Sequence, residues 1–166
     1  MILTEKKNLF SICMLGGTFQ EYLLQPRLHS KFEWVTVERH AADRKKLRLR
    51  LQQHEVELIK KNKQFVADGF AELELGCSPF DIECLVTAMV KGFILVSDDL
   101  DLVALAKEYE CPVLSTIQLL GLLYENSQVT QQEVIDIIEM WLWLEDVPST
   151  WKNDYKNAFG EVFPDD

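Results

Sequence analysis

Residues 81–102 read DIECLVTAMVKGFILVSDDLDL, and this stretch decides the fold. Its pattern predicts a helix over residues 81–91 and a buried strand over residues 93–98. The helix descends roughly 15 Å at ~1.5 Å per residue, and the strand returns roughly 17 Å at ~3.3 Å per residue. Because the two lengths nearly cancel, we expect Asp81 and Asp99 at the same edge of a sheet, where open α/β sheets bind ligands.

Three carboxylates lie within four residues at the end of this strand, namely Asp98, Asp99 and Asp101. Carboxylates that converge there with Asp81 repel one another, and a hard divalent cation such as Mg²⁺ or Mn²⁺ relieves that repulsion. Each acid also has a structural explanation, because Asp81 fits the third position of a capping box and the others fit the start of the next helix. A plain α/β domain whose Asp residues only cap helices is therefore an alternative interpretation.

The rest of the chain alternates helical patterns with short apolar runs. The expected strands cover residues 32–37, 56–59, 93–96 and 112–114. The expected helices after residue 38 cover residues 39–53, 64–75, 81–91, 100–109 and 117–124. This alternation predicts an α/β fold, a three-layer α/β/α sandwich with a central, mostly parallel sheet.

Some segments leave two interpretations open. The opening residues 1–3 are compatible with a strand, and residues 10–15 fit a strand or a helix. The LRLRL run at residues 47–51 alternates like a strand although it lies within an expected basic helix. The Gly16-Gly17 pair predicts a break after the first apolar segment.

The character of the sequence changes after Asn126, so we expect a domain over residues 1–126 and a C-terminal helical extension over residues 127–166. A capping box at residues 130–133 opens a helix that is expected to run through Leu144. Its apolar face is broad, and Trp143 adds a second apolar side. We expect this helix to pack on the domain or to form a subunit interface, as in a homodimer.

The net charge of −10 is unevenly distributed along the 166 residues. Residues 44–63 hold eight basic and two acidic residues, a local charge of about +6, so the remainder carries about −16. An acidic protein is a poor non-specific ligand for nucleic acid. A basic strip on an acidic body can still guide a phosphodiester backbone, with a solvated helix face as the alternative.

The four cysteines are scattered and form no C-x-x-C pair, which favours thiols in a reducing cytoplasm over disulfides or zinc ligands. No apolar run reaches the ~18 residues of a membrane span, so we expect no membrane association.

The stretch that follows Leu75 resembles the core of the PIN-domain nucleases. The pattern D-x-x-x-x-x-T-A-x-x-x-G-x-x-L-V-[ST]-x-D is matched by Asp81, Thr87, Ala88, Gly92, Leu95, Val96, Ser97 and Asp99. Ser78-Pro79 before the helix and the A-x-x-x-x-x-P-V-L run at residues 106–114 are also typical of the family. The resemblance covers about residues 75–123, and the C-terminal helices resemble those of a group of prokaryotic PIN-like proteins.

The resemblance implies a metal-dependent ribonuclease whose carboxylates hold Mg²⁺ or Mn²⁺. Asp81 and Asp99 would be metal ligands, Asp101 or Asp98 would assist, and Ser97 would orient a ligand or water. The family's second acid corresponds to Asp43, with Glu38 as the alternative. The expected RNA-binding residues are Arg44, Lys45 and Arg48 of the basic strip. A toxin–antitoxin role would add an antitoxin protein as partner.

The sequence departs from the family at its first strand. Thr4 stands where the family places an Asp, Glu5 is adjacent, and Asn8 is a second degenerate match. Losing this ligand would weaken metal binding and the formation of hydroxide. The competing hypothesis is therefore an inactive relative, a non-catalytic PIN-like module that acts through protein contacts.

Overall fold

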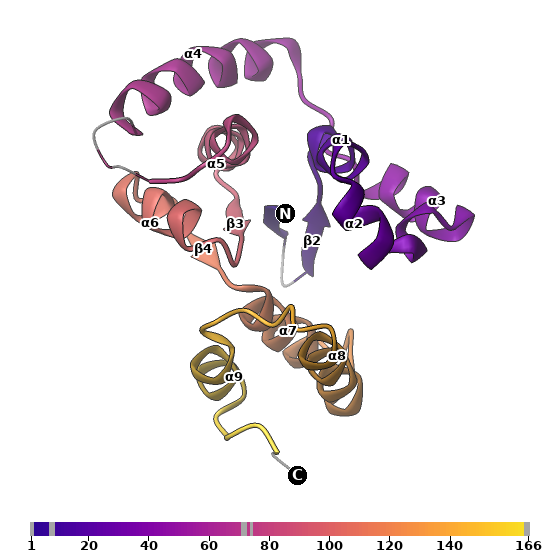
Figure 1. Cartoon of the computed structure of the whole chain (residues 1–166). Helices are drawn as coiled ribbons and strands as arrows, with labels where there is room; N and C mark the ends of the chain where they lie inside the picture. The colour runs from indigo at the N-terminus through magenta and orange to yellow at the C-terminus, as the bar shows by residue number, and fades with distance from the viewer. Residues whose placement is uncertain (1, 7–8, 71–72, 74, 165–166) are drawn as a thin grey trace. The chain divides into compact units, whose positions relative to one another are not determined.

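The computed structural model describes residues 2–6, 9–70, 73 and 75–164 (Figure 1). The chain divides into two compact units, of which the first comprises Met1–Leu95 and Leu100–Pro112. The second comprises Val96–Asp99 and Val113–Asp166, so it contains the whole expected extension and also the segment that precedes it.

Helices dominate the described residues. The α-helices are α1 (Gly16–Leu24), α2 (Pro26–Lys31), α3 (Glu38–Leu47), α4 (Gln53–Phe70), α5 (Pro79–Lys91), α6 (Leu100–Glu108), α7 (Thr116–Glu125), α8 (Gln131–Trp143) and α9 (Trp151–Phe159). A 3₁₀ helix, η1, spans Glu33–Thr36. The described strands are β1 (Ile2–Lys6), β2 (Leu9–Cys13), β3 (Ile94–Val96) and β4 (Val113–Leu114).

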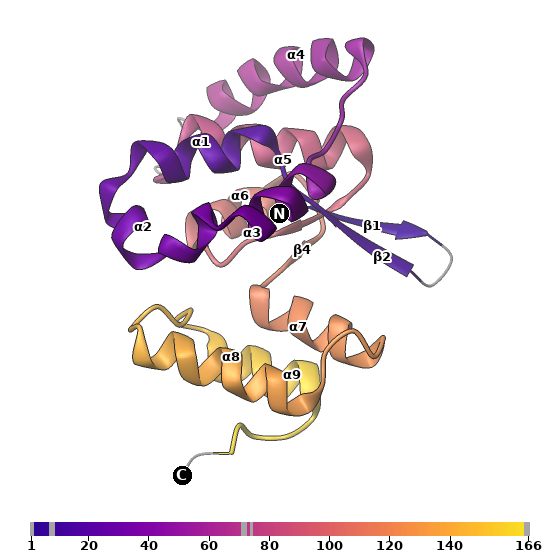
Figure 2. The same cartoon turned by 90° about the vertical axis from the view of Figure 1, so that its right-hand side faces the viewer.

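The described sheet is small and has the order β2-β1-β3-β4. β1 pairs antiparallel with β2, with Thr4 opposite Ser11, and antiparallel with β3, with Ile2 opposite Leu95. Figure 2 shows the hairpin that β1 and β2 form. β3 and β4 run parallel, because the Leu95 N–H donates to the Pro112 carbonyl and the Ser97 N–H donates to the Leu114 carbonyl.

The predicted three-layer α/β/α sandwich with a central, mostly parallel sheet is wrong. Its strands would have to form a wide platform covered on both faces, but the described strands have five, five, three and two residues. Most of the described chain is instead helical, and β1 is antiparallel to both of its neighbours.

Two of the expected strands are helical in the structure. Residues 56–59 lie inside the 18-residue helix α4, where Ile59 is buried and Val56 is exposed. Residues 33–36 form η1. Short apolar runs fit a strand or a helical segment equally well, and here the helical packing prevails. The strand at 93–96 and the short strand at 112–114 are confirmed in shorter form.

The N-terminal ambiguities are resolved in favour of strands. Ile2 and Leu3 belong to β1, and residues 10–13 belong to β2, whereas Met1 lies outside the described residues. In the LRLRL run, α3 ends at Leu47, and Arg48 forms an isolated parallel bridge with Met14. The backbone of Met14 bonds to Leu47 and Leu49, so the alternating run lies beside the end of β2 instead of continuing the helix.

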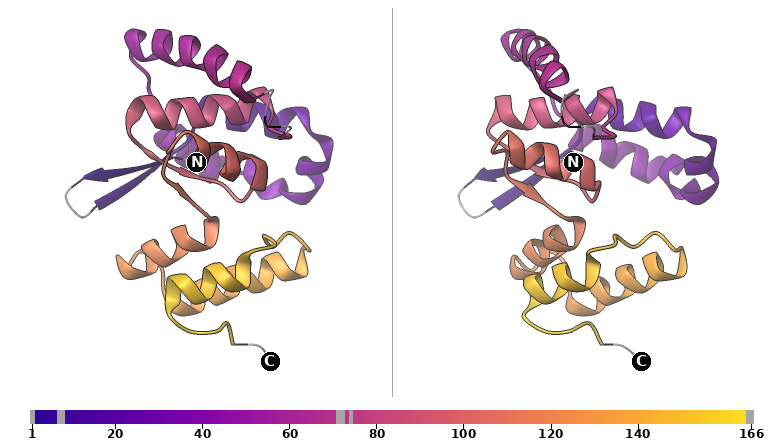
Figure 3. Two further views of the ribbon diagram at one scale, coloured as in Figure 1. Left: turned by 90° about the vertical axis from the view of Figure 1, so that its left-hand side faces the viewer. Right: turned by 60° about the vertical axis from the view of Figure 1, so that its left-hand side comes forward.

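The first unit is organised around α5, against which α4 packs (Figures 1 and 3). Ser78 caps α5, Pro79 occupies its first turn, and Gly92 ends it in the left-handed conformation at φ 62°. The capping box predicted at Asp81 is confirmed, although α5 begins at Pro79, two residues before the predicted residue 81. The inner face of α5 is fully buried at Leu85, Val86 and Ala88, which places the middle of this helix in the core.

The second unit is a small helical core of its own. Its buried cluster comprises Ile117, Leu120, Val134, Ile138, Trp151, Tyr155 and Phe163. α7 and α9 approach closely at Gly121, since a Cβ atom built there would lie 2.8 Å from the Cβ of Ala158. The expected capping box of α8 is present, with the Thr130 side chain accepting a hydrogen bond from the Glu133 N–H. No helix within the described ranges is long and apolar enough to cross a membrane.

Candidate functional site

The first site residue, Asp81, is held by the start of α5. The Asp81 N–H donates to the Ser78 Oγ at 3.2 Å, and the Ser78 N–H donates to the Asp81 Oδ2 at 2.8 Å. The reciprocal bonds form the predicted capping box. They fix the carboxylate in the first turn of α5 and use one of its two oxygens.

Asp101 binds the same loop from a different helix. It lies in the first turn of α6, and its Oδ2 accepts the Gly76 N–H at 2.9 Å. Gly76 leaves room for this approach, because a Cβ atom there would lie 2.8 Å from the same oxygen. The Gly76 and Ser78 N–H groups are two residues apart, at most about 7 Å along the chain. The structure therefore brings Asp81 and Asp101 to one short segment.

The other acids of the strand end belong to the second unit. The Asp98 carboxylate accepts the Thr116 N–H at 2.9 Å and also the Thr116 hydroxyl, so it anchors the start of α7. Asp99 is exposed, and its backbone N–H donates to the Ser97 Oγ at 3.1 Å. Ser97 thus orients the backbone of Asp99, and Asp98 has a structural role.

The side chains present decide whether a divalent metal ion would fit this site. Among the residues that the structure describes, no group of three or more His, Cys, Asp or Glu side chains is gathered to hold a metal. Mg²⁺ in phosphoryl-transfer sites is commonly bound through one or two carboxylates, with waters and substrate phosphates supplying the remaining ligands. Asp81 and Asp101 each use Oδ2 for a backbone bond, which leaves Oδ1 for such a ligand. These two carboxylate oxygens fit the ligand chemistry of Mg²⁺. The proximity of Asp81 and Asp99 stays a prediction.

The candidates for the second acid lie on α3. Asp43 is exposed and forms an ion pair with Lys46, whose Nζ is 3.2 Å from the Asp43 Oδ1. Glu38 is the first residue of α3 and is also exposed. The N-terminal match is described in part: Thr4 and Glu5 lie in β1, and Asn8 falls outside the described residues.

The predicted RNA-binding residues share one cavity in the first unit. Arg44, Lys45 and Arg48 all line a cavity of about 840 Å³. The Arg44 guanidinium donates to the Val35 carbonyl and lies 4.7 Å from the centre of the Phe19 ring. The basic end of α3 therefore faces a concave surface and not only bulk solvent.

Sequence reasoning missed the residues opposite this basic end. Gly16 and Gly17 at the start of α1 line the same cavity. A Cβ atom on Gly16 would lie 3.0 Å from the Arg48 Nη2, so the absent side chain makes room for the guanidinium. The glycine pair was interpreted only as a break, although paired glycines also permit close approach.

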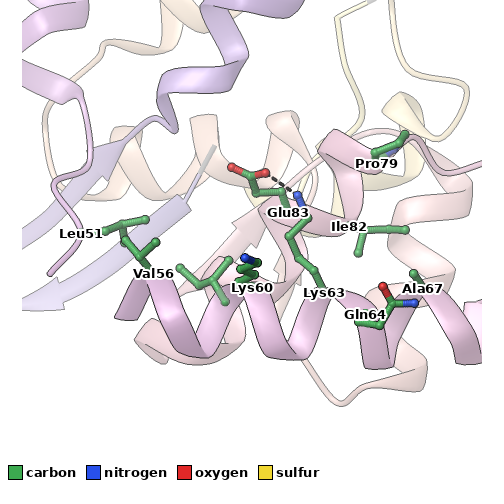
Figure 4. Close-up of a pocket in the computed structure, with 10 residues that line it drawn as sticks. Leu51, Val56, Lys60, Lys63, Gln64, Ala67, Pro79, Ile82 and Glu83 are labelled. Carbon is green, nitrogen blue, oxygen red and sulfur yellow. Dashed lines mark hydrogen bonds and ion pairs between the residues drawn. The ribbon is translucent and has the colours of Figure 1, made fainter. Parts of the chain in front are cut away.

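A second groove lies between α4 and α5 and has a volume of about 480 Å³ (Figure 4). Lys63 crosses it to Glu83 with an N–O distance of 2.5 Å. Lys91 reaches Glu55, also at 2.5 Å. The hydrogen bond from Lys91 lowers the pKa of Glu55 from its usual value, and the Gln52 backbone N–H lowers it further. Glu55 is a buried carboxylate that joins the two helices.

Burial also raises the pKa of two thiols, Cys13 and Cys111, which makes them poor nucleophiles. All four cysteines are thiols and not disulfides, as expected.

Comparisons of the chain with models of protein families, with curated proteins and with solved structures found no match.

Proposed function

We propose that the chain is a divalent-metal-dependent ribonuclease, the activity implied by its resemblance to PIN-domain nucleases. The observation that carries the proposal is the shared loop: Asp81 from α5 and Asp101 from α6 bind backbone N–H groups two residues apart. Carboxylates held by backbone bonds are pre-positioned, which suits ligands of a hard cation.

In this proposal Asp81, Asp99 and Asp101 hold Mg²⁺ or Mn²⁺. Held by these residues, such an ion would supply a more acidic water and would neutralise charge on the scissile phosphodiester. The chain's own contribution is orientation, because Ser97 fixes the Asp99 backbone and the loop at Gly76–Ser78 fixes the other two acids. Arg44, Lys45 and Arg48 compensate the charge of neighbouring phosphates.

The proposed setting is the cytoplasm, which the cysteine thiols support. An antitoxin protein is the proposed partner if the ribonuclease belongs to a toxin–antitoxin pair. Such a partner would have to restrain the activity before the ribonuclease damages cellular RNA.

The deciding experiment is cleavage of a labelled single-stranded RNA by the full chain, in EDTA and over a Mn²⁺ titration. Asp81→Asn, Asp99→Asn and Asp101→Asn keep side-chain shape, and an amide oxygen still accepts a backbone N–H. Each is expected to lower cleavage by about 100-fold. The matched control is Asp136→Asn, whose carboxylate accepts a hydrogen bond from Gln132 on the exposed side of α8. Cleavage that persists in EDTA, or that Asp99→Asn leaves intact, rejects the proposal.

A second candidate, a non-catalytic interaction module, is favoured by the C-terminal end of α8. Trp143 is 82% exposed, and Met140 and Leu142 are also exposed. Large apolar side chains gathered on one helix end favour a partner surface, here a second copy of the chain. Sedimentation equilibrium should then show a dimer that Trp143→Ser weakens and Leu24→Ser, an equally exposed position on α1, does not. A monomer at every concentration, together with Mn²⁺-dependent turnover, excludes this candidate.

A further inference from the structure

Two cavities of different chemistry share a wall in the first unit. The basic cavity of about 840 Å³ and a second cavity of about 440 Å³ are both lined by Met14, Phe19 and Arg44. Each volume falls within the range of ligand sites in proteins, ~300–1,000 Å³. Their common wall makes them neighbouring compartments.

The smaller cavity is aromatic and apolar. It is lined by Phe19, Tyr22, Leu28, Phe32, Val35 and Leu47, among others. The Phe19 and Tyr22 rings stack with centroids 5.8 Å apart, and the buried Tyr22 hydroxyl donates to the Phe32 carbonyl at 3.2 Å. The polar lining includes Asp43 and His40. A flat, largely apolar group with a few polar atoms at its edge, such as a nucleobase, matches this lining.

The larger cavity is cationic. Lys45 and Arg48 line it together with Arg44, and the glycines at the start of α1 bring backbone close to Arg48. Glu83 also lines it, but its carboxylate is engaged by Lys63 at 2.5 Å. Guanidinium and ammonium groups with little competing negative charge match a phosphate.

Arg44 connects the two compartments. Its guanidinium is held by the Val35 carbonyl on one side and by the Phe19 ring at 4.7 Å on the other. A guanidinium carries five N–H donors, so donors remain after the bond to Val35. A group held in this way keeps a fixed orientation between an apolar and a charged compartment.

We propose that the two cavities form one site for a nucleoside monophosphate unit, with the base in the aromatic cavity and the phosphate in the basic cavity. This inference rests on the proposed function, since it names one unit of an RNA substrate that the chain would hold. Its test needs neither a metal ion nor cleavage. A free nucleotide presents the same chemistry as one unit of RNA.

The test is calorimetric titration of the full chain in EDTA with AMP, adenosine and inorganic phosphate. AMP is expected to bind at least about tenfold more tightly than either fragment, because only AMP fills both compartments. Arg48→Ala and Lys45→Ala are each expected to lower the affinity for AMP by about tenfold and to leave the affinity for adenosine unchanged. Leu47→Trp fills the aromatic cavity and is expected to lower the affinity for both AMP and adenosine.

The matched control is Lys107→Ala, which removes one positive charge from the exposed side of α6, outside the basic strip. Thermal melting of every variant distinguishes loss of the binding site from unfolding of the chain. Arg48→Lys should restore part of the affinity for AMP.

A short single-stranded RNA that displaces AMP identifies RNA as the source of the nucleotide unit, whereas failure to displace AMP identifies a free nucleotide as the ligand. Equal binding of AMP and adenosine, no AMP binding, or an equal loss in Lys107→Ala overturns the proposal. If AMP fails to bind while Mn²⁺-dependent cleavage is present, the ribonuclease proposal stands without this site.

Discussion

Asp81 and Asp101 bind neighbouring backbone N–H groups of one three-residue segment, Asp81 at Ser78 and Asp101 at Gly76. The two acids are 20 residues apart in sequence and lie on different helices. The loop between α4 and α5 therefore depends on both carboxylates, and any change that moves the loop moves both acids. Stability and metal binding are expected to be coupled here.

Gly76→Ala tests this coupling directly. The new methyl group would lie 2.8 Å from the Asp101 Oδ2, so the bond to the Gly76 N–H must lengthen. We expect a loss of about 1 kcal/mol in the free energy of unfolding, measured by urea denaturation. In an Asp101→Ala background the same change should cost much less, and equal costs in the two backgrounds would show that the bond contributes nothing.

The Glu55–Lys91 ion pair predicts a specific acid sensitivity. Because the pKa of Glu55 is lowered in the folded chain, its contribution is complete above the usual value of 4.5 and is lost as the pH falls through the lower folded value. The stability difference between the native chain and Glu55→Gln should therefore be constant near neutral pH and shrink below pH 4.5. Glu57→Gln is the control, since the Glu57 carboxylate accepts its bond from Gln53 and not from a lysine. A difference that persists unchanged into acid would contradict the assignment.

Thr87 offers a stabilising substitution in the core of the first unit. Its side chain is fully buried, and its hydroxyl has no hydrogen-bond partner among the described residues. Thr87→Val has nearly the same shape and removes the unsatisfied group, so the free energy of unfolding should rise by about 1 kcal/mol. Thr87→Ser keeps the hydroxyl and loses a methyl group, so it should lower stability. A destabilised Thr87→Val would reveal a bond that the hydroxyl makes.

Gly121 is expected to be intolerant of a side chain. A Cβ atom there would lie 2.8 Å from the Cβ of Ala158, closer than two carbons approach without a shift. Gly121→Ala should lower the free energy of unfolding of the second unit by about 1–3 kcal/mol, measured by thermal denaturation, because the new methyl group overpacks the contact between α7 and α9. Adding Ala158→Gly should restore part of this loss, and an unaltered effect in that background would argue against direct contact.

Local signals were the most predictable part of the fold. Ser78, Pro79 and Asp81 set the start of α5 through contacts within one helical turn, and the capping box found is the one expected. The same holds for Thr130 and Glu133 at α8. Capping depends on near neighbours in sequence, so it survives errors about the rest of the fold.

The wider architecture was not predictable from the same patterns. Val56 and Ile59 form an apolar pair in a short run, and only the length of α4 shows that they belong to a helix. In the candidate site, too, the contacts between residues far apart in sequence were not predictable. The joining of Asp101 to the Asp81 loop depends on Gly76, 25 residues before Asp101, and no periodicity signals it. The basic cavity likewise depends on Gly16 and on its distance from Arg48 across 32 residues of chain.

The two ion pairs between α4 and α5 also determine how these helices align. Glu55 meets Lys91 and Lys63 meets Glu83, so a step of eight residues forward on α4 matches eight residues back on α5. A slide of one helical turn would set Ile59 against a charged side chain in either direction and separate both pairs at once. The two helices therefore have one favourable register, and a partial slide forms neither ion pair. This arrangement would disfavour misaligned pairings of the two helices.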